Sequence, residues 1–310
     1  MSATSHPSSR PTHLDPSELG TKEYWDRYYQ NDLDNDDSDA EQEDDDEAGA
    51  PEPPDPSDLE SWFDDVGAPA KTLEFLTSDS FPLSPSYTGN NGGAPTQAAP
   101  TVLDLGTGNG SALFSLHLEG GYAGCMVGVD YSSQSVELAR KLCRQYFPAS
   151  DSSSSTSDGG DGRDGRITFE VLDLINDNPT TQPWWPRDAE GAPSAFDLVL
   201  DKGTFDAISL SSSTTTEPST GQDRRICELY PSRVLDMVKP DGFLLVTSCN
   251  WTEDEVVSWF TGAGATGSGS ANRTGKFEVY GRIRYPVFEF GGQKGQGVAS
   301  VCFRKTTGTS

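Results

Sequence analysis

From residue 100 onward, short apolar runs alternate with longer stretches in which apolar residues recur at helical spacing. The short runs predict buried strands, and the longer stretches predict amphipathic helices. The predicted strands cover residues 102–105, 126–129, 167–172, 196–200 and 243–247. The predicted helices cover residues 111–119, 204–210, 224–238 and 252–260, with one more from Ser132 or Ser133 to about Tyr146. Alternating strands and helices are typical of a parallel sheet with helices on both faces.

Two further apolar stretches close this pattern, at residues 277–290 and 298–304. The glycine-rich residues 291–297 join them, so we expect an antiparallel hairpin. The predicted fold is therefore a doubly wound α/β fold, Rossmann-like, with a mostly parallel seven-stranded sheet and a C-terminal antiparallel hairpin.

The residues before 100 show a different pattern. Residues 1–17 are polar and rich in Pro and Ser, and we expect a disordered tail. Helical spacing of apolar residues predicts an N-terminal helix over 18–30. Residues 31–58 form an acidic low-complexity insertion, and residues 59–76 predict one helix or two short ones. The folded domain is expected over 59–305, with low-complexity loops near 79–99, 149–165, 178–195, 211–223 and 261–275.

The net charge of −27 is unevenly distributed, because residues 31–60 hold 15 Asp and Glu and no Lys or Arg. An acidic surface repels phosphates, so the charge disfavours direct nucleic-acid binding and suits a basic protein partner. The five cysteines are scattered without a Cys-x-x-Cys pair, so we expect neither a metal site nor a disulfide framework. No stretch approaches the ~20 apolar residues of a membrane span, and no apolar signal region is expected.

The first candidate site is the turn Gly106-Thr107-Gly108-Asn109-Gly110, which follows the predicted strand 102–105. Glycines allow a sharp turn into a helix and a close approach of the backbone to a ligand. Such a turn alone is also compatible with an ordinary strand–helix connection. Asp104 lies on the buried strand, where an isolated carboxylate is costly. We expect it to accept backbone hydrogen bonds from the turn or to meet the amino group of a ligand.

Two more carboxylates end the next two predicted strands. Asp130, with Tyr131 beside it, is placed to accept the two hydroxyls of a ribose. Asp173 is placed to accept from an adenine amine, with Leu172 or Leu174 packing on the ring. A solvated strand-end Asp explains each residue alone, but the recurrence at consecutive strand ends favours a cofactor site.

Two cofactor classes use such a site. Dinucleotide-binding folds favour G-x-G-x-x-G and place a pyrophosphate at the helix N-terminus. This chain has the shorter G-x-G-x-G spacing, and Asp104 would repel a pyrophosphate. S-adenosylmethionine has no phosphate and carries two cationic groups that suit Asp104. The sequence therefore favours a methyltransferase over a dehydrogenase.

The predicted fourth strand ends in Asp201-Lys-Gly-Thr-Phe-Asp-Ala207, where the reacting methyl group should point. This segment lacks the (Asn/Asp)-Pro-Pro-(Tyr/Phe) typical of amide and adenine methyltransferases, which argues against those substrates. Asn250 and Trp251 follow the fifth strand as candidates for the acceptor pocket. Trp251 either forms a wall of that pocket or is structural.

These segments together resemble the eukaryotic lysine methyltransferases of translation elongation factor 1-alpha, a class I, seven-strand family. The most specific matches are Asp201–Ser209 and Ser248–Thr252; the others are Leu19–Tyr29, Leu103–Gly110, Val129–Ser132 and Phe288–Gly292. The chain departs from the family after Trp62-Phe63, where Asp64-Asp65 stand in place of Gly-Glu.

The resemblance implies a cytoplasmic enzyme that methylates a lysine of elongation factor 1-alpha by in-line displacement at the methyl carbon. The lysine must arrive uncharged, and burial lowers its pKa. Asp201 is the predicted catalytic residue, orienting the amine or the methionine portion of the cofactor. Trp25 either closes over the cofactor or docks in the core. The alternatives are a small-molecule methyltransferase and an inactive cofactor-binding scaffold, and the intact strand-end carboxylates argue against the scaffold.

Overall fold

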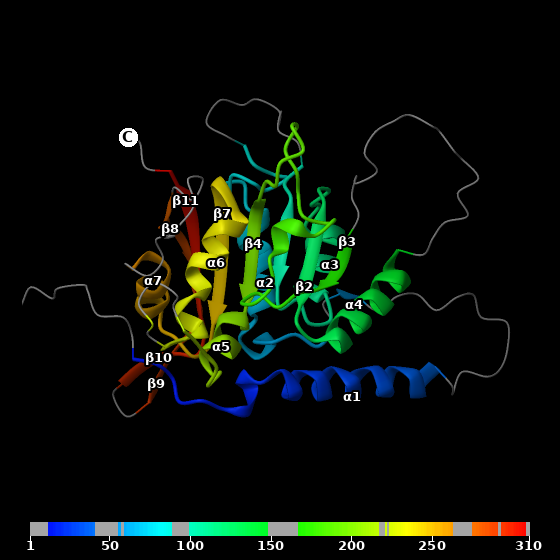
Figure 1. Cartoon of the computed structure of the whole chain (residues 1–310). Coiled ribbons are helices and arrows are strands. Elements are labelled where there is room, and N and C mark those ends of the chain that lie inside the picture. The colour runs from blue at the N-terminus through cyan, green and yellow to red at the C-terminus, as the bar shows by residue number, and fades with distance from the viewer. Residues whose placement is uncertain are drawn as a thin grey trace, which may run out of the picture.

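The computed structural model describes residues 12–40, 55–56, 59–88, 99–147, 167–216, 221, 223–262, 275–290 and 293–307, without the side chains of 36–40, 287–290 and 293–296. Seven strands of this part form one sheet in the order β3-β2-β1-β4-β7-β11-β8 (Figure 1). They are β1 Val102–Leu105, β2 Met126–Asp130, β3 Ile167–Val171, β4 Phe196–Lys202, β7 Val238–Ser248, β8 Lys276–Ile283 and β11 Ala299–Thr306.

The pairing of these strands confirms the predicted fold class. β1 pairs in parallel with β2 and β4, β3 in parallel with β2, and β7 in parallel with β4. β11 is antiparallel to both of its neighbours, β7 and β8. The sheet is therefore mostly parallel and ends in an antiparallel pair from the C-terminal part of the chain.

The side chains of the central strands alternate between two cores, one on each face of the sheet. In β1, Leu103 and Leu105 belong to one core and Val102 to the other, because successive side chains of a strand point to opposite faces. The first core also takes side chains from α5 (Thr204–Ser209), α6 (Tyr230–Met237) and α7 (Glu253–Thr261). The second takes them from α1 (Lys22–Ala40), α2 (Ala68–Thr77), α3 (Ser111–Leu118) and α4 (Ser133–Tyr146). Helices thus cover both faces.

Two helix starts follow local signals in the sequence. Ser132 is the N-cap of α4, and its side chain accepts a hydrogen bond from the backbone N–H of Ser135. Thr252 and Glu255 form a capping box at the start of α7. Both arrangements satisfy backbone N–H groups that have no partner within the helix. The predicted starts of these two helices are confirmed.

The N-terminal helix differs from its predicted bounds. Residues 18–20 form a short 3₁₀ helix, η1 (Glu18–Gly20), and α1 runs from Lys22 to Ala40, well into the residues assigned to the acidic insertion 31–58. Leu33, one turn after the buried Tyr29, is itself buried and continues the apolar stripe. The neighbouring Asp34 is exposed and Asp32 is only partly buried, so a helix with a low apolar content still packs through one side. No helix in the described part of the chain has both the length and the apolar composition of a membrane span.

The tail assigned to residues 1–17 is also corrected in part. Residues 12–17 pack on the domain, while residues 1–11 lie outside the described part. The Arg225 guanidinium donates to the carbonyl of Leu14 at 2.6 Å, and Ser17 N–H donates to the carbonyl of Leu210 at 3.1 Å. The ring of His13 stacks on Trp259. These partners lie far along the chain, so local composition did not reveal them.

Three predicted low-complexity loops contain packed structure. Phe81, in the loop near 79–99, is 1% exposed and contacts Phe243. Trp185, in the loop near 178–195, is also 1% exposed and donates to the carbonyl of Ser194 at 2.8 Å. The loop near 211–223 contains β5 (Thr214–Thr216), which pairs with β6 (Asp223–Arg225). Nearly all of 149–165 and 261–275 lies outside the described residues.

Two element bounds change for identifiable reasons. The helix predicted over 224–238 is only α6, after β6 and a 3₁₀ turn, η5 (Ile226–Glu228), because Arg225 is held extended by its bonds to the carbonyls of Ser209 and Ser211. The strand predicted over 277–290 divides at Pro286, which lacks the N–H that a ladder needs. Its second part, β9 (Val287–Phe290), pairs with β10 (Gln293–Gln296) in a separate ribbon. The remaining short elements are η3 (Asp64–Val66) and η4 (Pro179–Thr181).

Candidate active site at the strand ends

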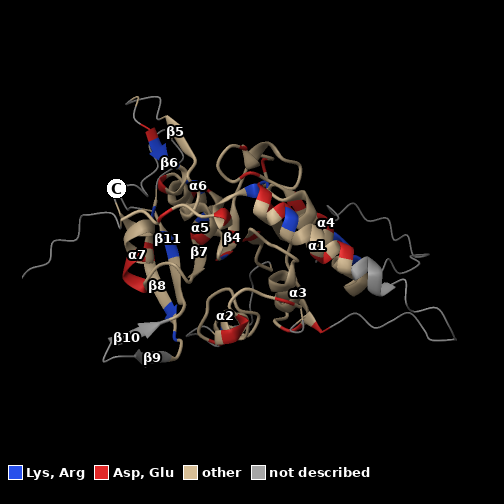
Figure 2. Cartoon of the chain, turned by 90° about the horizontal axis from the view of Figure 1, so that it is seen from below, with Lys and Arg blue, Asp and Glu red and all other residues tan. Residues whose placement is uncertain are grey.

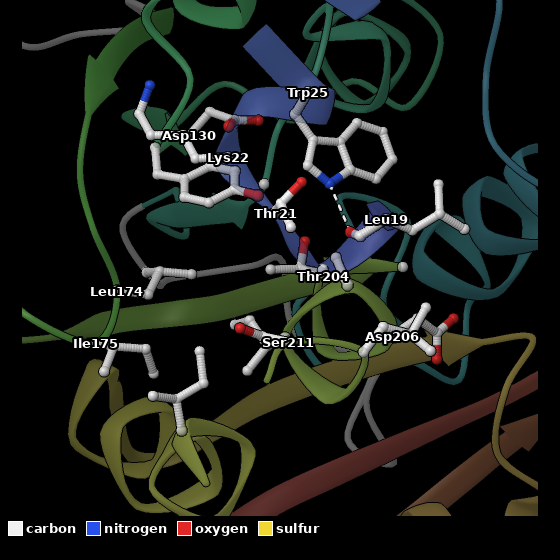
Figure 3. Close-up of a pocket in the computed structure, with 18 of the residues that line it drawn as sticks. Leu19, Thr21, Lys22, Trp25, Asp130, Leu174, Ile175, Thr204, Asp206 and Ser211 are labelled. Carbon is white, nitrogen blue, oxygen red and sulfur yellow. Dashed lines mark hydrogen bonds between the residues drawn. The ribbon is translucent and has the colours of Figure 1, made fainter. Parts of the chain in front are cut away.

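A cavity of about 460 Å³ lies at the carboxyl ends of the parallel strands. Gly106, Asp130 and Lys202, which end or directly follow β1, β2 and β4, line one side of it. η1 and the first turns of α1 line the other side, through Leu19 and Trp25 among others. Figure 3 shows Asp130 and Leu174 across the cavity from Leu19. The cavity thus lies between the sheet and a segment from the N-terminal part of the chain.

Each glycine of the turn is required for a different structural reason. Gly106 lines the cavity with a φ of 62°, a left-handed conformation that favours glycine. A Cβ on Gly108 would lie 2.7 Å from the Tyr29 hydroxyl, and one on Gly110 would lie 2.7 Å from the Phe169 ring. Gly106 is therefore the predicted cofactor glycine that borders the cavity, while Gly108 and Gly110 make room for other parts of the protein.

Asp104 is buried behind the turn. Its Oδ2 accepts a hydrogen bond of 2.7 Å from the Thr107 hydroxyl, so the donor in the turn is a side chain and not the backbone N–H that the sequence predicted. Burial raises the pKa of Asp104 to about 6, against the lowering effects of Thr107 and of the positive charge of Lys202. Asp104 borders a second, smaller cavity of about 210 Å³.

Asp130 ends β2 with its carboxylate toward the larger cavity. Its Oδ1 accepts from the backbone N–H of Ser132 at 2.9 Å, and its Oδ2 accepts from that of Gly108 at 3.3 Å. Burial raises the pKa of Asp130, and these bonds lower it. Each oxygen keeps a lone pair for a hydroxyl of a ligand. The neighbouring Tyr131 also lines the cavity, with Lys22 Nζ 6.0 Å from its ring centroid.

Asp173 organises a loop that forms an apolar wall. Its Oδ1 accepts from the N–H groups of Ile175 and Asn176 at 2.9 and 3.0 Å. The resulting turn carries Leu174 and Ile175, which line the cavity together with Leu172. An apolar wall beside a carboxylate with further accepting capacity suits a flat, amine-bearing heterocycle.

Asp201, the predicted catalytic residue, is buried beneath the larger cavity and borders only the smaller one. Its Oδ2 accepts from the Tyr230 hydroxyl at 2.8 Å, and its Oδ1 accepts from the N–H groups of Thr204 and Phe205 at 3.0 and 3.1 Å. Burial raises the pKa of Asp201 to about 7. In this position the carboxylate holds the start of α5.

Asp206 is a cavity residue that the sequence reasoning did not single out. It lines the larger cavity from α5, and burial raises its pKa. Its carboxylate accepts hydrogen bonds from the Ser248 hydroxyl and, at 2.9 Å, from the backbone N–H of Cys249. The signal for it was the second Asp of Asp-Lys-Gly-Thr-Phe-Asp, on a predicted helix. Asp206 therefore joins the ends of β4 and β7 at the cavity.

The two candidates after β7 separate in the structure. Asn250 is exposed and lines the cavity. Trp251 is 5% exposed, packs its ring against Phe205, and donates from Nε1 to the Ser209 hydroxyl at 3.3 Å. This position favours the structural alternative for Trp251.

Aromatic side chains cover the cavity on its N-terminal side. Trp25 Nε1 donates to the carbonyl of Leu19 at 2.8 Å, as Figure 3 shows. Its ring lies 6.2 Å from that of Tyr29 and 5.4 Å from that of Trp62. Phe63 also lines the cavity, with a φ of 70° that is uncommon for a residue with a side chain. We call Trp25, Tyr29, Trp62 and Phe63 the aromatic roof.

Comparisons with known proteins place this chain in a family. Residues 97–153 match the family described as "Methyltransferase domain". The chain is 32% identical to "Protein-lysine N-methyltransferase EFM4" of Saccharomyces cerevisiae, over 94% of this chain and 96% of that protein. It is also 32% identical to the efm4 protein of Schizosaccharomyces pombe, over 94% and 95% of the two chains. "EEF1A lysine methyltransferase 2" of Homo sapiens is 28% identical over 94% of this chain and 88% of that protein. The chain belongs to the family of these protein-lysine N-methyltransferases.

Proposed function

We propose that the protein transfers a methyl group from S-adenosylmethionine to a lysine side chain of translation elongation factor 1-alpha. The observation that carries this proposal is the similarity to lysine methyltransferases along nearly the whole chain, Asp201–Ser209 and Ser248–Thr252 included. The chemistry of the larger cavity supports it independently.

The residues of the cavity fit the cofactor. Asp130 offers two buried oxygens to the ribose hydroxyls, and Tyr131 lies beside it. Leu174 packs on the adenine, and Asp173 accepts from its amine. Gly106 allows the turn to approach the ligand closely. Thr107 and Gly108 support this arrangement by bonding Asp104 and Asp130, and Gly110 gives Phe169 its place behind the turn.

Bound S-adenosylmethionine supplies a methyl group on a positively charged sulfur, so the protein has to provide alignment and a neutral amine. The acceptor lysine enters where α5 and the end of β7 meet the cavity, beside Asp206 and Asn250. Burial of the amine and the positive charge of the sulfonium disfavour the ammonium form and lower the pKa of the lysine. Alignment and exclusion of water then provide most of the rate enhancement.

Two carboxylates divide the work at the end of β4. Asp206 lines the larger cavity and receives the amine, with Ser248 fixing its orientation. Asp201 lies beneath the larger cavity and acts indirectly. Its oxygens accept hydrogen bonds from the N-terminus of α5 and from the Tyr230 hydroxyl. We therefore assign Asp201 to the positioning of α5, and so of Asp206. Trp25 closes over the cofactor, and Trp251 supports the loop that carries Asn250.

The substrate and compartment follow from the same proposal. An acidic enzyme with a net charge of −27 is attracted to a basic protein, and exposed charges act mainly on the encounter rate. Elongation factor 1-alpha works in the cytoplasm, so we propose that location for the enzyme. Because the chain is acidic, we propose no direct binding of nucleic acid. We assign the catalytic domain to residues 59–305, to which α1 adds Trp25 and Tyr29 of the aromatic roof.

Methyl transfer from labelled S-adenosylmethionine to proteins of a cell lysate tests the proposal. We expect one labelled band at the mass of the elongation factor, with the label on a lysine after peptide mapping. The Asp206→Asn variant is expected to lose most of this labelling and to keep its affinity for S-adenosylhomocysteine. Label confined to the small-molecule fraction would support the alternative of a small-molecule methyltransferase. Cofactor binding without any label transfer would support the inactive scaffold.

A further inference from the structure

Lys202 connects the two cavities at the end of β4. It lines the larger cavity together with Gly106 and Asp130, and it lines the smaller one together with Asp104 and Asp201. No other Lys or Arg is among the described residues that line the smaller cavity. The Lys202 ammonium therefore lies between the two cavities. A ligand that extended from the larger cavity past the glycine turn into the smaller one would meet it.

The ammonium group of Lys202 has few partners in the protein. It donates one hydrogen bond, of 3.0 Å, to the Ser61 hydroxyl. None of the ion pairs among the described residues includes it. Burial lowers the pKa of Lys202, while the charges of Asp104 and Asp64 raise it. An ammonium has three donors, so the structure leaves this cation able to bind an anion.

Asp104 faces the same space with the opposite charge. Its Oδ2 accepts from Thr107, and its Oδ1 accepts no hydrogen bond from the described residues. Asp104 and Lys202 shift each other's pKa without forming an ion pair. Both side chains line the smaller cavity. A carboxylate and an ammonium that line one cavity without pairing to each other complement an amino acid, which carries both charges on one carbon.

A second feature of the smaller cavity also favours an anion. Ser111 and Ala112, in the first turn of α3, line it. The N-terminus of a helix carries a partial positive charge and backbone N–H groups. The other carboxylates that line this cavity are Asp64, Glu119 and Asp201, and Asp201 is already held by Tyr230 and by the N-terminus of α5.

We propose that Lys202 binds the α-carboxylate of the cofactor's methionine portion, opposite Asp104, which binds its α-ammonium. This subsite rests on the proposed function, because it assigns one end of the same cofactor. It explains why a lysine occupies a buried position among carboxylates at the end of β4. It also gives the enzyme a means of rejecting adenosine compounds that lack the amino-acid group.

Calorimetric binding of two ligands tests the subsite without measuring catalysis. S-adenosylhomocysteine carries the amino-acid group, and 5′-methylthioadenosine lacks it. In Lys202→Met, we expect the affinity for S-adenosylhomocysteine to fall about tenfold to hundredfold, as for a lost hydrogen bond to a charged group. The affinity for 5′-methylthioadenosine should stay within about twofold of the wild type, a difference too small for a lost polar contact.

The control variant is Lys71→Met. Lys71 lies on α2, next to residues that line the smaller cavity, but does not line it itself. The Lys71→Met substitution removes the same charge near the site and should leave the affinities for both ligands unchanged. An unchanged affinity of Lys202→Met for S-adenosylhomocysteine would overturn the proposal. An equal loss for both ligands would also overturn it, because it would show that Lys202 supports the fold of the site.

A second measurement needs no variant. Wild-type protein should bind the decarboxylated analogue of S-adenosylhomocysteine about tenfold to hundredfold more weakly than the parent compound. Equal binding of the two would refute a carboxylate subsite even if Lys202→Met did not fold. Failure of the proposed function would give a different result. The protein would still discriminate between these ligands, but it would leave elongation factor 1-alpha unlabelled.

Discussion

The two sides of the larger cavity are built in different ways. On the sheet side, Asp104, Asp130 and Asp173 are each held by a group within three residues along the chain. On the other side, the aromatic roof is held by contacts between distant segments. Trp25 meets Trp62, and Tyr29 reaches the glycine turn at Gly108. The sheet side is therefore fixed by local backbone geometry, and the roof by tertiary packing.

This difference indicates which side of the cavity provides the binding energy for the cofactor and which side covers it. Buried carboxylates that keep accepting capacity bind the polar groups of the cofactor strongly, because the site replaces water by fixed partners. Aromatic rings contribute contact area and exclusion of water. Figure 2 shows α1 beside α4, and the two helices are in contact, so the part of the roof on α1, Trp25 and Tyr29, is attached through that helix. The following predictions test this division.

The largest effect is expected from the sheet side. Asp130→Ala should lower the affinity for S-adenosylhomocysteine at least ~100-fold, since two charge-assisted hydrogen bonds are lost. Isothermal titration calorimetry measures this. Asp26→Ala is the control: this carboxylate belongs to α1, pairs with Lys22 at 2.6 Å and does not line the cavity. An affinity of Asp130→Ala close to that of the control would remove the ribose assignment.

A smaller effect is expected where the two sides meet. Gly108→Ala places a Cβ 2.7 Å from the Tyr29 hydroxyl at a φ of 59°. We expect a loss of about 2 kcal/mol in the free energy of unfolding, from left-handed strain plus the clash. Urea denaturation measures it. In a Tyr29→Phe background the loss should fall to about 1 kcal/mol, because only the strain remains.

Gly67→Ala is the matched control for the strain alone. Gly67 has a φ of 67°, and nothing lies within 4 Å of its added Cβ. Its substitution should cost about 1 kcal/mol in any background. If Gly108→Ala cost no more than this control, the close packing of the roof against the turn would be ruled out.

The smallest effect concerns pH and the positioning carboxylate. Burial raises the pKa of Asp201 to about 7 from a model-compound value of 3.8. The folded state then holds a proton that the unfolded state has released, so this group's contribution to stability is present below pH 3.8 and is lost as the pH rises to about 7. Asp201→Asn should therefore make the free energy of unfolding fall less steeply over this window, by roughly 1 kcal/mol per pH unit.

Urea titrations at several pH values measure that slope. Tyr230→Phe provides a second check, because it removes the hydroxyl that lowers the pKa of Asp201. The falling limb should then extend to higher pH. A slope that is identical in the wild type and in Asp201→Asn would contradict the raised pKa.

Local signals explain which parts of the fold were predictable. The apolar runs predicted the strands of the parallel sheet, and the caps Ser132 and Thr252 predicted where α4 and α7 begin. These features depend on residues within a few positions of each other. By contrast, the acidic composition of residues 31–40 concealed a helix, because Leu33 needed a core on another element in order to be buried.

The candidate site divides in the same way. Asp104, Asp130 and Asp173 were identified from their positions at strand ends, since parallel strands bring such ends together. Asp206 and Lys202 belong to the motif Asp201–Ala207, but sequence alone did not show which of its side chains borders which cavity. That choice depends on how α5 leaves β4 and on the bond from Ser248 after β7.

The sequence by itself determined the alternation of strands and helices, the glycine turn and the strand-end carboxylates, because each is encoded by neighbouring residues. Only the tertiary structure decided that Tyr29 fills the space over Gly108, that Trp251 lies in the core, and that Lys202 stands between two cavities. These positions arise from contacts between segments far apart in the chain. Their energies depend on packing and burial, which no local pattern of residues specifies.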